Sequence, residues 1–134
     1  MTVATTRQIR EYISHVDPFN HHPVAASTKI PEGVAVGEDS SGNARNLVAA
    51  DTFLGFAEKE ADNSSGSAGD IDVKVRRRGR VVLAVGSAVA TDVGANIYAS
   101  DNNTFTKTST SNSLIGTASR FVEAGVLEVE IQGA

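Results

Sequence analysis

The chain has 134 residues, with 12 Lys and Arg against 16 Asp and Glu, and therefore a formal net charge of −4. This length fits one domain, and the acidic balance disfavours nucleic-acid binding, which needs a basic face. Cysteine is absent, which excludes disulfides, thiolate nucleophiles and cysteine-ligated metals. Trp is also absent, and the many small and β-branched residues favour thin β-layers over a bulky helical core.

The first 23 residues have a different pattern from the rest. Thr5 and Gln8 have the spacing of a helix-capping box, and Asp17-Pro18 ends the helix. One apolar face follows the cap at i, i+3, i+4 and i+7, formed by Ile9, Tyr12, Ile13 and Val16. A helix of about eleven residues is marginal alone in water, so this face must rest on its own domain, a sister subunit or a partner. We define residues 1–23 as the N-terminal arm.

From Val24 onward the helical period is lost, and residues 24–134 read as one β-domain. Short strands separated at regular intervals by turn residues favour a β-sandwich or barrel. Residues 61–69, rich in Ser and Gly, are expected to be a flexible insertion. The strand candidates are residues 25–30, 33–38, 46–50, 53–58, 71–77, 80–85, 95–99, 104–107, 113–121 and 126–132.

The β-domain contains an internal repeat. The five residues 53–57, Phe-Leu-Gly-Phe-Ala, recur 61 positions later as residues 114–118, Leu-Ile-Gly-Thr-Ala, and the likeness extends over residues 33–79 and 94–133. Glycine inside a strand weakens it unless a bulge or a close backbone approach needs it. Gly55 and Gly116 are therefore expected to make the same bend in each copy. The pattern predicts an all-β sandwich or barrel built from two similar halves, preceded by an arm with one short helix.

No constellation of catalytic, cofactor-binding or metal-binding residues is found in the sequence. The adjacent His21 and His22 point to opposite sides of an extended chain, which makes them a poor chelate. The chain has neither a G-x-S-x-G nucleophile elbow nor a phosphate-binding loop. The Asp- and Asn-rich stretches 39–43 and 101–103 fit hairpin turns better than calcium loops. We expect no enzyme activity and no cofactor.

The only charge cluster is the run Arg76-Arg77-Arg78-Gly79-Arg80. Guanidinium groups bind carboxylates through paired hydrogen bonds, so this run is a candidate electrostatic contact. Three surroundings fit this run: solvent, an acidic patch on another protein, or nucleic acid. Nucleic acid is the least favoured of the three because the rest of the chain is acidic. We find no export signal and no membrane-spanning stretch, and expect no membrane partner.

Several segments together resemble a family of tailed-phage capsid decoration, or cement, proteins. The likeness lies in residues 31–37, 53–57, 73–79, 93–101, 114–118 and 127–131, and it covers most of the β-domain but not the arm. The resemblance implies a compact β-domain, sandwich or barrel in form. It also implies a non-enzymatic oligomer on the outside of the capsid that clamps neighbouring major coat protein subunits, after assembly in the host cytoplasm. We favour a trimer, and a dimer is possible, since both suit a lattice with threefold and twofold positions.

Two sets of residues are candidate contacts for such a role, the arm residues because a short isolated helix cannot leave its apolar face in water, and the arginines because of their charge. The arm residues would touch the capsid or a sister subunit, and the arginines would provide an electrostatic contact. The alternative function is a receptor- or carbohydrate-binding β-domain of a phage fibre or spike, for which the chain offers few aromatic platforms. The arm set is Ile9, Tyr12, Ile13, Val16 and Phe19, and the electrostatic set is Arg76, Arg77, Arg78 and Arg80.

Overall fold

The computed structural model describes residues 6–8 and 17–134, and these residues form twelve β-strands and one 3₁₀ turn. The first half of the described chain contains β1 (Phe19–Pro23), β2 (Thr28–Ile30), β3 (Ala35–Glu38), β4 (Ala44–Asn46), β5 (Thr52–Ala57), β6 (Ala61–Asn63) and β7 (Asp72–Arg76). The second half contains β8 (Arg78–Ala84), the 3₁₀ turn η1 (Ala90–Asp92), β9 (Asn96–Asp101), β10 (Thr104–Thr106), β11 (Ser113–Glu123) and β12 (Val126–Gln132).

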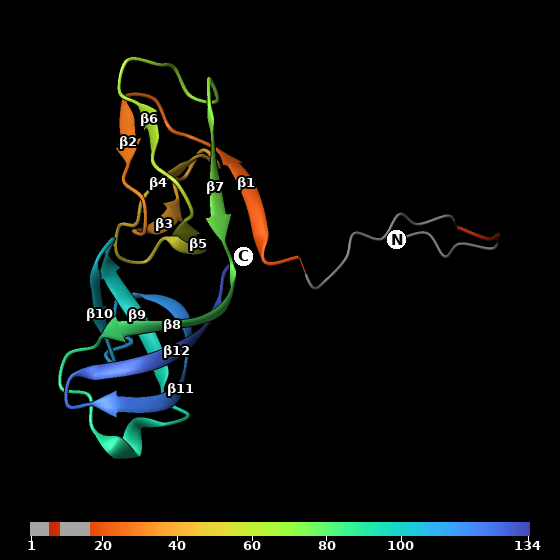
Figure 1. Cartoon of the computed structure of the whole chain (residues 1–134). Coiled ribbons are helices and arrows are strands. Elements are labelled where there is room, and N and C mark those ends of the chain that lie inside the picture. The colour runs from red at the N-terminus through yellow and green to blue at the C-terminus, as the bar shows by residue number, and fades with distance from the viewer. Residues whose placement is uncertain (1–5, 9–16) are drawn as a thin grey trace.

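Two five-stranded antiparallel sheets make up most of the fold. The first sheet has the order β1-β7-β5-β3-β4, and the second has the order β10-β9-β11-β12-β8. The strands β2 and β6 pair with each other in a separate two-stranded sheet. Figure 1 shows the first sheet in the upper lobe and the second in the lower lobe, with the chain crossing between them from β7 to β8. The predicted all-β sandwich is confirmed, and no barrel closes among the described residues.

The two halves repeat each other strand by strand. The pairing of β3 with β5 recurs, 61 positions later and with the same break in register, in the pairing of β9 with β11. The β1–β7 and β5–β7 pairings recur as β8–β12 and β11–β12. Two examples are Val36–Gly55 with Ile97–Gly116, and Phe56–Arg76 with Thr117–Glu130. The predicted two similar halves are therefore present, and each half contains one five-stranded sheet.

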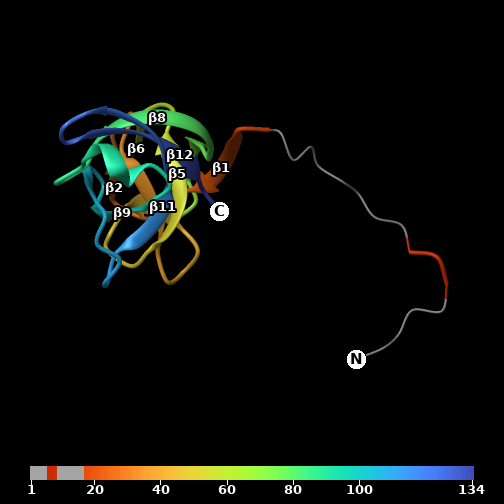
Figure 2. The ribbon, with the colours of Figure 1, turned by 90° about the horizontal axis from the view of Figure 1, so that it is seen from below.

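The break in register at β5 gives the first sheet two buried faces. Across the break, Phe53 and Phe56 reach one side of the sheet and Leu54 reaches the other. Leu54 packs in a cluster with β2 and β6, whereas both phenylalanines pack into the core of the second half. The ring centroids of Phe56 and Phe105 lie 5.8 Å apart. One face of the first sheet therefore covers the core of the second. In Figure 2, which looks at the molecule from below, β5 lies over the region of β11 and β12.

The prediction of a flexible insertion over residues 61–69 is wrong for its first part. Ala61–Asn63 forms β6, which pairs with β2. The buried amide nitrogen of Asn63 donates hydrogen bonds to the carbonyls of Ala25 and Ser67, each over 3.0 Å. These bonds hold the following turn in place, because an amide buried in this way is costly unless it is hydrogen-bonded.

The end of the N-terminal arm belongs to the first sheet. Residues 19–23 form β1, which pairs along the whole of β7. The predicted division of the chain at residue 24 stays a prediction, although the sheet begins five residues earlier. The expected arm helix, with Ile9, Tyr12, Ile13 and Val16, lies outside the described residues.

The matched glycines yield a stability test. A Cβ atom on Gly116 would collide with the backbone carbonyl of Glu130 on β12, as one on Gly55 would with that of Arg76 on β7. We predict that Gly116→Ala lowers the free energy of unfolding by about 1–3 kcal/mol, as overpacking does. Urea unfolding at fixed temperature measures this loss. Gly86→Ala is the control, since a Cβ atom added there would meet no other atom within 4 Å, and its effect should stay within about 0.5 kcal/mol. Equal stability of the Gly116→Ala variant and the natural protein would contradict the prediction.

Candidate functional site

The strands β7 and β8 follow each other where the chain passes from the first sheet to the second, and we call residues 72–84 the crossing strand. Only Arg77 separates β7 from β8. The N–H of Arg77 donates to the carbonyl of Pro18 over 2.7 Å, and its carbonyl accepts from the N–H of Gly133 over 2.8 Å. The arginine run predicted as a contact therefore lies where the arm, the crossing strand and the end of β12 meet.

At the β7 end of this strand, two cations lie against the ring of Phe19. The Lys74 ammonium is 4.3 Å and the Arg76 guanidinium carbon is 4.5 Å from the ring centroid. Such cation–π contacts contribute about 0.5–1 kcal/mol each at exposed sites. Arg76 also lies 3.5 Å from the Glu58 carboxylate. Phe19, predicted as a contact residue, is thus partly buried against its own domain and holds two cations in place.

At the β8 end, two arginines have no acidic partner within the described chain. The Nη1 atom of Arg78 donates to the carbonyl of Gly133 over 2.8 Å. Arg80 is exposed and lies across from Glu130 in the strand register. Within residues 6–8 and 17–134, no carboxylate lies within 4 Å of the charged nitrogens of either arginine. The structure thus spreads the arginine run over two strands, with Arg76 at the end of β7, Arg78 and Arg80 on β8, and Arg77 between them.

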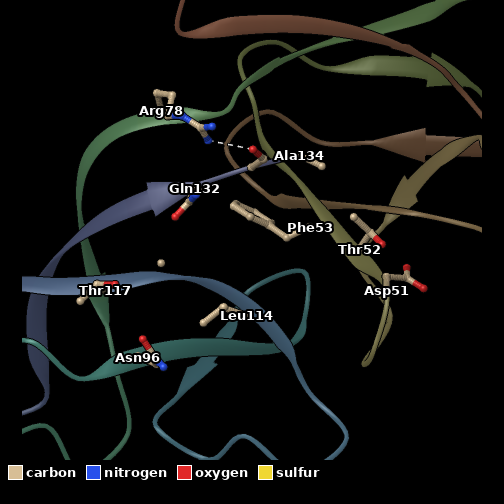
Figure 3. A pocket seen from close by; sticks show the side chains of 11 residues that line it. Asp51, Thr52, Phe53, Arg78, Asn96, Leu114, Thr117, Gln132 and Ala134 are labelled. Atoms are coloured by element: carbon tan, nitrogen blue, oxygen red, sulfur yellow. Dashed lines mark hydrogen bonds between the residues drawn. The ribbon is translucent and has the colours of Figure 1, made fainter. Parts of the chain in front are cut away.

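A cleft of about 640 Å³ lies between the start of β5 and the second sheet. Figure 3 shows Phe53 in this cleft, Leu114, Thr117 and Asn96 on the side of the second sheet, and Arg78 near the chain end. Leu114 is 53 % exposed although it is the repeat counterpart of the buried Phe53. In the described chain, the face of the second sheet that carries Leu114 is therefore open, whereas the matching face of the first sheet, which carries Phe53, is buried.

The carboxylate in the cleft is already bound. Asp51 accepts hydrogen bonds from the Nη2 and Nε atoms of Arg45, over 2.8 and 3.0 Å, and from the N–H of Val48 over 3.0 Å. A general acid or base must be able to reach a substrate proton, and these bonds occupy both oxygens of Asp51. Asp51 therefore links Arg45 and the Val48 backbone at the edge of the cleft.

The remaining polar clusters stabilise turns. Asp39 accepts from the N–H groups of Ser41 and Asn43, over 2.8 and 2.9 Å. Asp101 accepts from the N–H of Asn103 over 2.9 Å. These backbone bonds lower the pKa of both carboxyl groups because they favour the charged form. Among the described residues, no group of three or more His, Asp or Glu could hold a metal ion.

In the part of the chain that the structure describes, none of the helical segments has the length and apolar character needed to cross a membrane.

Comparison with known proteins shows the family of this chain. A family model described as "Structural cement protein (E217 gp24/Pam3 gp6)" matches residues 8–132. The chain belongs to this family, so it is a structural cement protein of a phage, a virion capsid component that associates with capsid proteins. The resemblance predicted from the sequence is confirmed. No curated protein and no solved structure matched the chain.

The partly buried His22 is expected to make the stability of the fold depend on pH. It occupies the position that Leu83 fills in the second half, and its Nε2 atom has no hydrogen-bond partner among the described residues. Burial lowers the pKa of His22, although Glu38 and Asp72 act in the opposite direction. Below pH 6.5, the ordinary pKa of histidine, the unfolded chain binds a proton that the folded chain binds less readily. Stability therefore falls as the pH drops through this range.

We predict that His22→Leu reduces the loss of melting temperature between pH 7.5 and pH 5.5, because leucine takes up no proton. Thermal unfolding followed by circular dichroism at both pH values measures this. The control is His21→Gln at the neighbouring exposed position. A His22→Leu variant that loses as much melting temperature as the natural protein would show that His22 does not couple folding to pH.

Proposed function

We propose that this protein binds the outer surface of a phage capsid and stabilises the contacts between neighbouring major coat protein subunits. The observation that carries the proposal is the match of nearly the whole chain, residues 8–132, to the structural cement family. A cement protein catalyses no reaction, and we propose that this chain has no enzyme activity. It needs a rigid body, a surface complementary to the lattice, and several binding sites in one assembly.

The structure supports this role in two ways. The aromatic packing between the halves joins both sheets into one body, which can transmit force between two coat subunits. The basic residues on the crossing strand offer charge for acidic coat surfaces. We propose a small oligomer, with a trimer favoured and a dimer possible, because linked copies multiply weak contacts through their effective concentration.

The first test is binding to undecorated heads of the phage that encodes the protein. After mixing and sedimentation, we expect the protein to co-migrate with the heads at a stoichiometry that matches the lattice. The decorated heads should also withstand a higher temperature before they release DNA, because each bound copy must be lost before the coat subunits separate. Failure to bind heads, together with binding to glycans, would support the fibre or spike alternative instead.

The second test concerns the arm, whose residues Ile9, Tyr12, Ile13 and Val16 we propose as contacts with the capsid or a sister subunit. Deletion of residues 1–16 should abolish head binding or oligomer formation. The deletion stops before residue 19 because β1 is part of the first sheet. Sedimentation with heads and light scattering in solution measure the two outcomes. A matched full-length variant carries Ser at the four apolar positions and should behave like the deletion. If both variants bind heads and keep their oligomeric mass, the arm is not a contact.

A further inference from the structure

The strand β8 has an open edge. Among the described residues β8 pairs only with β12, along its whole length, and only just beyond its end does Val85 form an isolated bridge with Phe105 of β10. The other edge strands are shorter, since β8 has 7 residues whereas β1 has 5 and both β4 and β10 have 3. Open edges present unpaired N–H and C=O groups to other chains, and proteins commonly keep such strands short. A long open edge on a protein that works by binding is therefore a candidate interface.

The hydrogen-bond pattern shows which residues of β8 face the open edge. The N–H of Val85 donates to the carbonyl of Gly125 over 2.9 Å, on the side of β12. The register of β8 with β12 has no break, so the N–H groups of Val81 and Leu83 point the same way. The N–H groups of Arg80 and Val82 alternate with these and point to the open side. Val82 is also 55 % exposed, so nothing in the described chain covers it.

A groove of about 470 Å³ runs beside β8 and can receive side chains of an added strand. Its floor is apolar, with Phe56 from the first sheet and Val81, Leu83 and Ile131 from the second. Arg76, Glu58 and the exposed Glu32 also line it, and Arg76 and Glu58 form an ion pair with each other. An extended chain on β8 would point alternate side chains toward this groove, because successive residues of a strand face opposite sides.

The positive charge on β8 favours one kind of segment at the open edge over another. Arg78 and Arg80 lie on the strand itself, and neither has a carboxylate within 4 Å in the described chain. A second copy of β8 would bring the same two positive charges to the interface, which like-charge repulsion disfavours. An acidic segment would instead form charge-assisted hydrogen bonds with both guanidinium groups.

We propose that β8 binds an extended, acidic segment of the major coat protein as an added β-strand. This inference rests on the proposed function and names the chemistry of the partner. Backbone hydrogen bonds to Arg80 and Val82 provide affinity, as in other cases of strand addition. Apolar side chains in the groove and carboxylates at the two arginines provide specificity. The attraction is electrostatic in part, so binding weakens as salt rises.

A matched pair of substitutions tests the backbone contact. Val82→Pro removes an N–H on the open side and leaves the bonds to β12 intact, whereas Val82→Ala shortens the side chain but keeps that N–H. Each purified variant is first checked for an unchanged melting temperature and then titrated onto undecorated heads. We expect Val82→Pro to weaken head binding by about tenfold or more and Val82→Ala to weaken it much less.

A charge reversal with a matched control tests the partner. Arg80→Glu should weaken head binding and flatten its dependence on NaCl concentration. Arg120→Glu makes the same change in net charge at another exposed arginine of the second sheet and should leave binding unchanged.

The outcomes separate this inference from the proposed function. If the natural protein binds no heads, the proposed function fails. If it binds and Val82→Pro and Arg80→Glu bind equally well, only the strand addition is wrong. Loss of self-association in Val82→Pro with unchanged head binding would assign the edge to a second copy, and binding of a DNA oligonucleotide that Arg80→Glu abolishes would assign it to nucleic acid. Either result overturns the proposal.

Discussion

The arrangement of the two halves depends on the aromatic contact between β5 and the second sheet. Phe56 lies 5.5 Å from Phe53 and 5.8 Å from Phe105, measured between ring centroids, and all three are buried. Both β5 rings reach the same side of the sheet because the register breaks beside Gly55. This contact sets the position of the second sheet relative to the first. The path of the crossing strand and the groove beside β8 follow from it.

The sequence predicts the repeat well because the requirement for its glycines is local. At Gly55 and Gly116 a carbonyl from the neighbouring strand occupies the place of a side chain, and both copies keep the same residue there. Which half covers the other could not be predicted, since Phe53 and Leu114 are both apolar but only one is buried. The strands β1 and β6 were missed for a related reason. Their residues include Pro23 and Asn63, which carry little strand signal, and only pairing with β7 and β2 makes them strands.

For the candidate site too, the sequence predicts some features, whereas others depend on which strands are neighbours. The arginine run is visible in the sequence as the only cluster of charge, and the structure places it where β7 of the first sheet passes into β8 of the second. The sequence does not reveal that Phe19 holds Lys74 and Arg76, because these residues meet only through the β1–β7 register. The open edge of β8 is equally hidden, since an edge is defined by which strands are neighbours. Strand candidates alone do not give that order.

A cement protein acts by shape, charge and repetition, and this chain offers a stiff two-sheet body with an open, basic strand along one side. The most direct measurement is electron cryomicroscopy of the virion at a resolution that traces strands. The account predicts this β-domain on the outer surface of the capsid, across a boundary between two coat subunits, with an extended coat segment paired along β8. Density for the protein on a fibre or spike, or on the capsid within the area of a single coat subunit, would contradict it.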